Sequence, residues 1–139
     1  MWITISKLED ANACYARDKM EHLFNGRKRV RLHTIMKTDI SLGDRLWCLK
    51  NLAPETFKEF IWRVLDRYFK SEIPKNVLQV LNDKVESKAL RPYTVAWRCA
   101  ELFKGDGFGY CFLVDLRLLD GEEGYAWAEE QMKDVTRCV

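Results

Sequence analysis

Residues 54–69, with the sequence PETFKEFIWRVLDRYF, decide the fold class of this chain. Large apolar side chains recur there at steps of three and four, with charged side chains between them. The apolar set is Phe57, Phe60, Ile61, Val64, Leu65, Tyr68 and Phe69. On a helix of 3.6 residues per turn, this spacing gathers the apolar groups into one broad stripe. The segment is therefore predicted to be a helix beginning at Pro54, a residue suited to the first helical position. So wide a stripe needs a large partner surface.

Further segments with helical periodicity can supply that surface. Helices are predicted over 6–24, 42–52, 74–88 and 93–104, and from residue 122 to the C-terminal end. Residues 110–121 are rich in leucine and poor in β-branched residues, which favours a helix over a hairpin strand.

Two short segments leave room for a strand. Residues 2–5 can pair as a short strand or form an extended segment before the first helix. Around Val30 and Leu32, a short strand and the start of a helix are both compatible with the sequence. The predicted fold class is mainly α: a compact single-domain bundle of about six helices over residues 1–139, with a minor short strand or hairpin as an option.

The composition is that of an ordinary globular protein. Of 139 residues, 47% are hydrophobic and 32% are charged, and the net charge of +2 is too small to predict a class of partner. The five cysteines (Cys14, Cys48, Cys99, Cys111 and Cys138) are odd in number and scattered, so we expect reduced, buried thiols in a cytoplasmic protein. Neither a signal peptide nor a membrane-spanning segment is expected.

The basic segment Arg27, Lys28, Arg29 and Arg31 is the sharpest electrostatic feature. Four cations within five residues can bind a phosphate backbone or an acidic protein face. The more ordinary interpretation is a solvated turn after a helix end, where cations also complement the helix dipole.

The five tryptophans are spread along the chain, a distribution typical of core residues. Trp62 is the exception, because it lies off the apolar stripe and is flanked by charges. We therefore add Trp62 to the basic segment as a candidate partner-binding residue.

No catalytic, cofactor-binding or metal-ligating set is recognised. Cys48 and His33 could be a nucleophile and its base, but Cys48 lies between Trp47 and Leu49 and is expected to be buried, and His33 is expected to be structural. The glycine cluster at 105–109 lacks the Lys and Ser/Thr of a phosphate-binding loop, so a hinge or close helix packing explains it better.

Two pieces of the chain resemble small helical proteins of unassigned function carried by bacteriophages and prophages. One piece begins at ITISKLEDANAC (3–14) and continues in LFNG (23–26) and VRLHT (30–34); the other is WAEEQMKDV (127–135). The resemblance implies a phage or prophage origin, with the host cytoplasm as the location, and an all-helical build. It transfers no catalytic residues.

These observations favour a non-enzymatic interaction protein that binds a host protein and inhibits it, with a bacterial defence complex as the expected target. The alternative is a nucleic-acid-binding accessory protein that uses the basic segment. The sequence leaves open the identity of the partner, the oligomeric state, the helical or strand state of residues 108–120, and whether the basic segment contacts nucleic acid or solvent.

Overall fold

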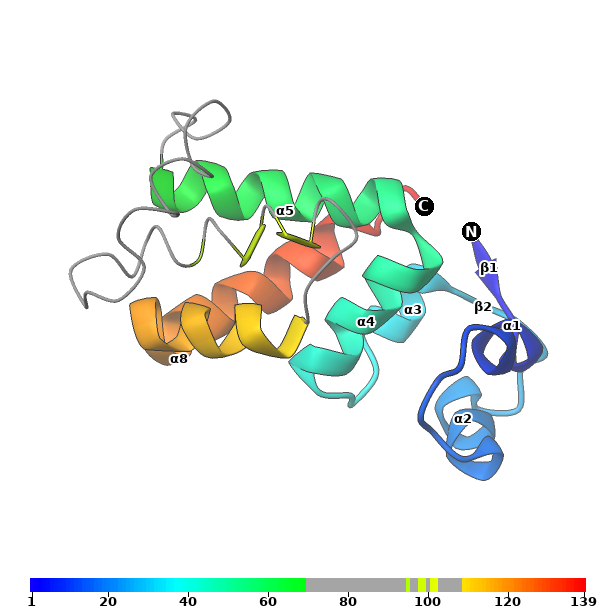
Figure 1. Ribbon diagram of the computed structural model, residues 1–139. Coiled ribbons are helices and arrows are strands. Elements are labelled where there is room, and N and C mark those ends of the chain that lie inside the picture. The colour runs from blue at the N-terminus through cyan, green and yellow to red at the C-terminus, as the bar shows by residue number, and fades with distance from the viewer. Residues whose placement is uncertain (70–94, 96–97, 100, 103–108) are drawn as a thin grey trace.

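The fold is mainly α, as predicted. The computed structural model describes residues 1–69, 95, 98–99, 101–102 and 109–139 (Figure 1). Its elements are β1 (Trp2–Ile3), α1 (Ile5–Asp10), α2 (Arg17–Phe24), β2 (Val30–Arg31), α3 (Leu32–Met36), α4 (Leu42–Leu52), α5 (Pro54–Phe69) and α8 (Gly109–Val135). The predicted helix over 74–88 and residues 105–108 of the glycine cluster lie outside the described residues.

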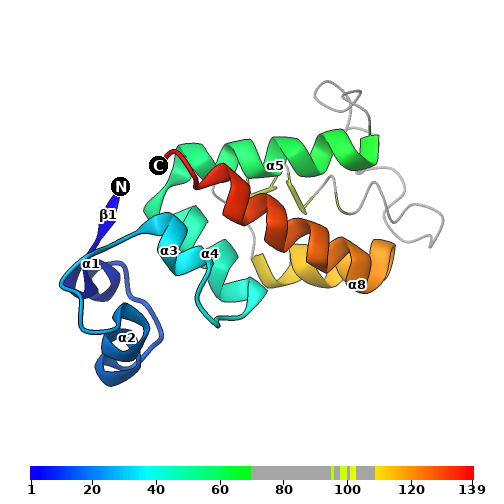
Figure 2. The same ribbon diagram turned by 180° about the vertical axis from the view of Figure 1, so that it is seen from behind.

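The apolar stripe of α5 packs against α4 and α8, which lie beside it in both views (Figures 1 and 2). Phe60, Ile61 and Val64 have no exposed surface, and Phe57 and Leu65 are nearly as buried. The ring of Phe60 meets that of Phe112 on α8 edge to face, with 6.3 Å between the ring centroids. The stripe predicted from sequence is therefore the centre of the core.

A further helical stretch adds to this core. Val95, Cys99 and Leu102 are helical and buried, and their spacing puts them on one side of a helix. The predicted apolar side of helix 93–104, made of Ala96, Trp97, Ala100 and Phe103, lies outside the described residues.

Helix α8 confirms the helical interpretation of residues 110–121 and of the C-terminal segment. Its two halves meet at Gly121, whose φ of 61° and ψ of −149° are non-helical and turn the chain sharply (Figure 1). That backbone region is open almost only to glycine. Gly124 is close to the bend, and a Cβ atom there would lie 2.8 Å from Cβ of Asp120. The bend therefore depends on the backbone freedom of Gly121 and on the absence of a side chain at Gly124.

The predicted first helix over 6–24 is wrong, because it is two helices. Thr4 caps α1 by accepting a hydrogen bond from the Lys7 amide at 3.1 Å. Asn12 then takes a φ of 62°, and the Ala13 amide donates to the Leu8 carbonyl. Asparagine tolerates this left-handed conformation, which ends a helix. The apolar periodicity continued through the break and concealed it.

Both short-strand options are realised. β1 pairs antiparallel with β2, with Trp2 opposite Arg31 and Ile3 opposite Val30. The chain then enters α3 directly, so the strand and the helix start that competed around Val30 and Leu32 both form, one after the other.

Arg45 on α4 joins three parts of the fold. Its side chain is buried, and its Nε and Nη2 donate to the carbonyls of Met36 and Thr38, each at 2.9 Å. Its Nη1 pairs with Glu129 on α8 at 2.7 Å. The planar guanidinium suits such a site because it offers five donors in fixed directions.

Polar contacts also join α5 to both halves of α8. Arg63 donates to Asp134 at 2.6 Å and to Gln131 at 2.9 Å, and the hydrogen bond from Arg63 lowers the pKa of Asp134. On the other side of the bend, the Tyr68 hydroxyl donates to Asp120 at 2.7 Å. These contacts fix the direction of α8 relative to α5.

We expect Phe60→Ala to lower the free energy of unfolding by about 3–5 kcal/mol, because it removes a fully buried ring and leaves a cavity. Chemical denaturation followed by far-ultraviolet circular dichroism measures the change. Lys58→Ala, on the opposite side of the same helix, is the control and should cost less than about 0.5 kcal/mol. Equal losses in both variants would contradict the placement of Phe60 at the centre of the core.

Candidate functional site

The β1–β2 pair presents two different faces. Ile3 and Val30 are buried, whereas their neighbours Trp2 and Arg31 are exposed, as expected for strands in which successive side chains alternate. Trp2 keeps 45% of its surface exposed. The prediction that Trp2 belongs to the core is therefore wrong, because no described element covers the outer face of the pair.

Two arginines lie over the Trp2 ring. The guanidinium carbons of Arg29 and Arg31 are 4.3 Å and 4.6 Å from the ring centroid. Exposed cation–π contacts contribute on the order of 0.5–1 kcal/mol each, which favours the stacked side-chain positions a few-fold without removing the charge of the arginines. The tryptophan thus orders part of the basic segment.

All four cations of the basic segment are exposed. Arg27 and Lys28 lie in the turn between α2 and β2, after Asn25 and Gly26 with positive φ values of 51° and 77°. Within the described residues, none of the four forms an ion pair with an acidic side chain. We call Trp2, Arg27, Lys28, Arg29 and Arg31 the ribbon patch. It combines a partly exposed aromatic ring with local positive charge.

Trp62 is exposed at 46% of its surface, as expected for a residue off the apolar stripe. It lies on α5, which packs on α4 and α8, whereas β2 packs on β1 and α3. The structure therefore places Trp62 and the basic segment on different parts of the fold. That Trp62 binds a partner stays a prediction.

Cys48 and His33 do not form a nucleophile and base. The Nδ1–H of His33 donates to the Lys133 carbonyl, and it lies at the same 3.0 Å from the hydroxyl oxygen of Thr136. Cys48 is buried, and its pKa rises to about 12, mainly through burial and further through the charge of Asp44. A neutral thiol is a poor nucleophile, so Cys48 packs in the core and His33 attaches α3 to the end of α8.

The other thiols divide by exposure. Cys99 is buried, which raises its pKa, whereas Cys14 and Cys138 are exposed. The expectation of uniformly buried thiols is wrong for these two, because the break after α1 and the turn after α8 carry them outward. Cys111 is intermediate.

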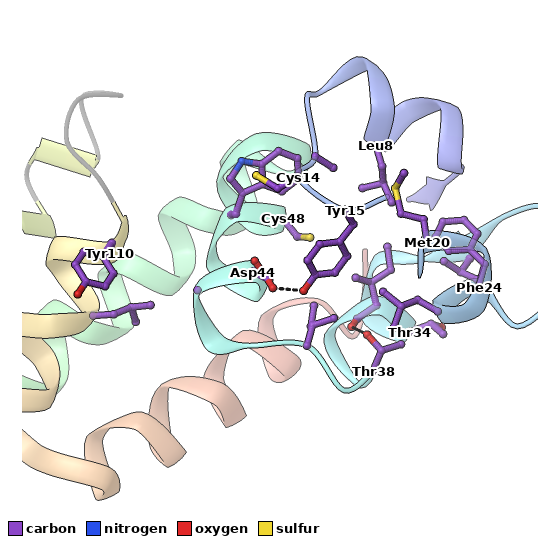
Figure 3. Close-up of a pocket in the computed structure, with 18 residues that line it drawn as sticks. Leu8, Cys14, Tyr15, Met20, Phe24, Thr34, Thr38, Asp44, Cys48 and Tyr110 are labelled. Atoms are coloured by element: carbon purple, nitrogen blue, oxygen red, sulfur yellow. Dashed lines mark hydrogen bonds between the residues drawn. The ribbon is translucent and has the colours of Figure 1, made fainter. Parts of the chain in front are cut away.

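A cavity of about 300 Å³ lies behind the inner face of β2 (Figure 3). Its lining comes from α1, the 11–16 break, α2, β2, α3, α4 and the first turn of α8. Two of the lining residues are joined to each other, because the Tyr15 hydroxyl donates a hydrogen bond to Asp44. Sequence reasoning did not find this cavity, because its walls come from separate segments that carry no shared local signal.

Gly109, at the start of α8, allows close packing against α4. A Cβ atom at Gly109 would lie 2.7 Å from Cδ2 of Leu46, a buried side chain. Close helix packing therefore accounts for this member of the glycine cluster.

Across the described ranges, no three His, Cys, Asp or Glu side chains come together in a way that could hold a metal ion. None of the helices described has the length and apolar content needed to cross a membrane.

The chain matches no protein-family model, no curated protein and no solved structure. The geometry of the ribbon patch and the cavity is thus the basis for proposing a function.

The thiols should react in the order of their exposure. Brief treatment of the native protein with iodoacetamide should modify Cys14 and Cys138, and leave Cys48 and Cys99 unmodified because they are buried and protonated. Peptide mapping by mass spectrometry measures the modification at each site, with the denatured protein as the control for full reactivity. Rapid modification of Cys48 in the native protein would show that its thiol is activated and would contradict the assignment of Cys48 as a core residue.

Proposed function

We propose that this protein is a non-enzymatic interaction protein that binds an acidic face of a host protein through the ribbon patch. The observation that carries the proposal is Trp2, 45% exposed, under two arginines that form no ion pair within the described residues. Tryptophan and arginine are the residue types most enriched among binding hot spots. Ordering by the ring also lowers the entropy that the arginines lose on binding.

The charge distribution favours a protein partner. The net charge of the chain is only +2, so the rest of the surface offers little general attraction for a polyanion. An acidic protein face needs only the local charge of the ribbon patch. Mutual charge complementarity would speed association and fix the orientation of the complex.

The proposal extends to origin and effect. The resemblance of the terminal segments to phage and prophage proteins supports a bacterial host, and we place the target in a host complex such as a defence system. Occupying the acidic face of such a complex would inhibit it by blocking the surface.

Affinity capture from a bacterial lysate tests the proposal. We expect Arg29→Gln/Arg31→Gln to lower capture of the target by about tenfold or more, because loss of both charges removes at least 1.4 kcal/mol of binding energy. Quantitative mass spectrometry of the captured proteins, at low and high salt, gives the ratio.

The matched control is Arg117→Gln/Arg137→Gln, which removes two exposed arginines elsewhere and changes the net charge equally. It should capture the target as the parent does. The proposal fails if no protein is enriched over background, or if both double variants retain it equally. Adding the purified protein to the captured complex then measures inhibition directly.

A nucleic-acid-binding role is the second candidate. Three of the four cations are arginines, whose planar forks match phosphate oxygens in pairs. On this alternative the protein retards DNA or RNA in a gel. A plot of log affinity for duplex DNA against log salt concentration should then fall with a slope of about 0.9 for each phosphate contact. Replacing Arg27, Lys28, Arg29 and Arg31 with Gln should abolish the shift. A quadruple variant that binds nucleic acid as well as the parent would rule this role out.

A further inference from the structure

The cavity behind β2 has the size of a small-molecule site. Its volume of about 300 Å³ is twice the roughly 150 Å³ in which a dry apolar cavity holds benzene. Its walls include Leu8, Met20, Phe24, Val30 and Ile35, which come from four successive elements (Figure 3). A molecule of two or three rings therefore fits its volume.

The cavity is lined almost entirely by apolar groups. Trp47 and Leu113 line it from α4 and α8, so the N-terminal part of the fold and the helical core both contribute walls. Transfer of an apolar molecule from water into such a space is favourable in proportion to the area removed from water. Ligand sites have this composition, with a few polar groups that fix orientation.

The polar groups of the lining disfavour a negatively charged ligand. Asp44 contributes the carboxylate, and its Oδ2 accepts the hydrogen bond from Tyr15. Burial and this hydrogen bond raise the pKa of Tyr15 to about 12, so the phenol keeps its proton and its bond to Asp44. No lysine, arginine or histidine is among the described residues that line the cavity. The ammonium of Lys19 lies 3.9 Å from the centroid of the Tyr15 ring but is not part of the lining. An anion inside the cavity would therefore meet the carboxylate of Asp44 without a cation in the lining itself.

Asp44 retains acceptor capacity for a ligand. Only its Oδ2 has a hydrogen-bond partner among the described residues, and a carboxylate has room for about four such bonds. Asp44 is half-buried and lines the cavity, so an N–H or O–H group on a bound molecule can reach it (Figure 3). The arrangement favours a donor over an acceptor.

We propose that this cavity is a binding site for a small aromatic molecule that carries no negative charge and donates one N–H or O–H hydrogen bond to Asp44. The site is separate from the ribbon patch and does not depend on the function proposed for it. Val30 lines the cavity on the inner face of β2, while Arg29 and Arg31 lie over Trp2 on the outer face.

Two fluorescent probes that share a skeleton test this site. N-phenyl-1-naphthylamine is neutral and carries one N–H, and 8-anilinonaphthalene-1-sulfonate adds a sulfonate to the same rings. We expect the neutral probe to bind with a stoichiometry of one and to raise the melting temperature. The sulfonate should bind about tenfold or more weakly because of Asp44.

Two variants and one control variant locate the bound probe. Ala13→Phe places a ring in the cavity from the 11–16 break and should abolish binding of the neutral probe, whereas Ala126→Phe, at an exposed position on α8, should not change it. Asp44→Asn should reduce the preference for the neutral probe over the sulfonate. Melting curves followed by circular dichroism confirm that each variant is folded.

Three results would overturn the site. They are a neutral probe that does not saturate, binding that survives Ala13→Phe in a folded protein, and a sulfonate that binds the parent as tightly as the neutral probe. If Ala13→Phe fails to fold, Thr34→Trp, which enlarges a half-buried side chain of the lining on α3, replaces it with the same expected loss.

Discussion

Burial of the α5 stripe is the interaction on which the rest of the structure depends. Five side chains from Phe57 to Leu65 are almost wholly removed from water, and each contributes about 2 kcal/mol before the entropy cost of ordering the chain. Among the described elements, α4 and α8 pack against them. The N-terminal elements bury their own apolar side chains in the same core, and Arg45 and His33 add polar contacts to it. The cavity is therefore part of this core, whereas the ribbon patch lies on its surface.

Much of the helical core could be read from the sequence, because its signals are local. The periodicity of α4 and α5, the Ser41 cap and the Pro54 start all act within a few residues. The break after α1 could not be read in this way. Its alanines and apolar residues keep helical spacing, and only the backbone of Asn12 reveals that the chain turns. The single-domain organisation stays a prediction.

The candidate sites were predictable only in part. The basic segment is a run of adjacent residues, so its charge was evident, and it is exposed as a binding role requires. Trp2 is 29 positions from Arg31 and reaches it only through strand pairing, which composition does not encode. The cavity is further out of reach, since Tyr15 and Asp44 meet only after α1, α2 and α4 have packed. These sites could not be predicted in full because they depend on contacts between residues that are far apart in the sequence, and residue types alone do not reveal such contacts.

The backbone conformation of Gly121 is one that L-residues rarely adopt and D-residues favour. No atom lies within 4 Å of the place where a Cβ would be built, so a side chain has ample room there. The backbone angles alone disfavour an L side chain at this position. The mirror image of its backbone angles is close to the extended polyproline region that ordinary residues prefer. D-Alanine, inserted by chemical ligation, would adopt the backbone angles of position 121 without strain and would stiffen the unfolded chain, whereas L-alanine would strain the folded backbone.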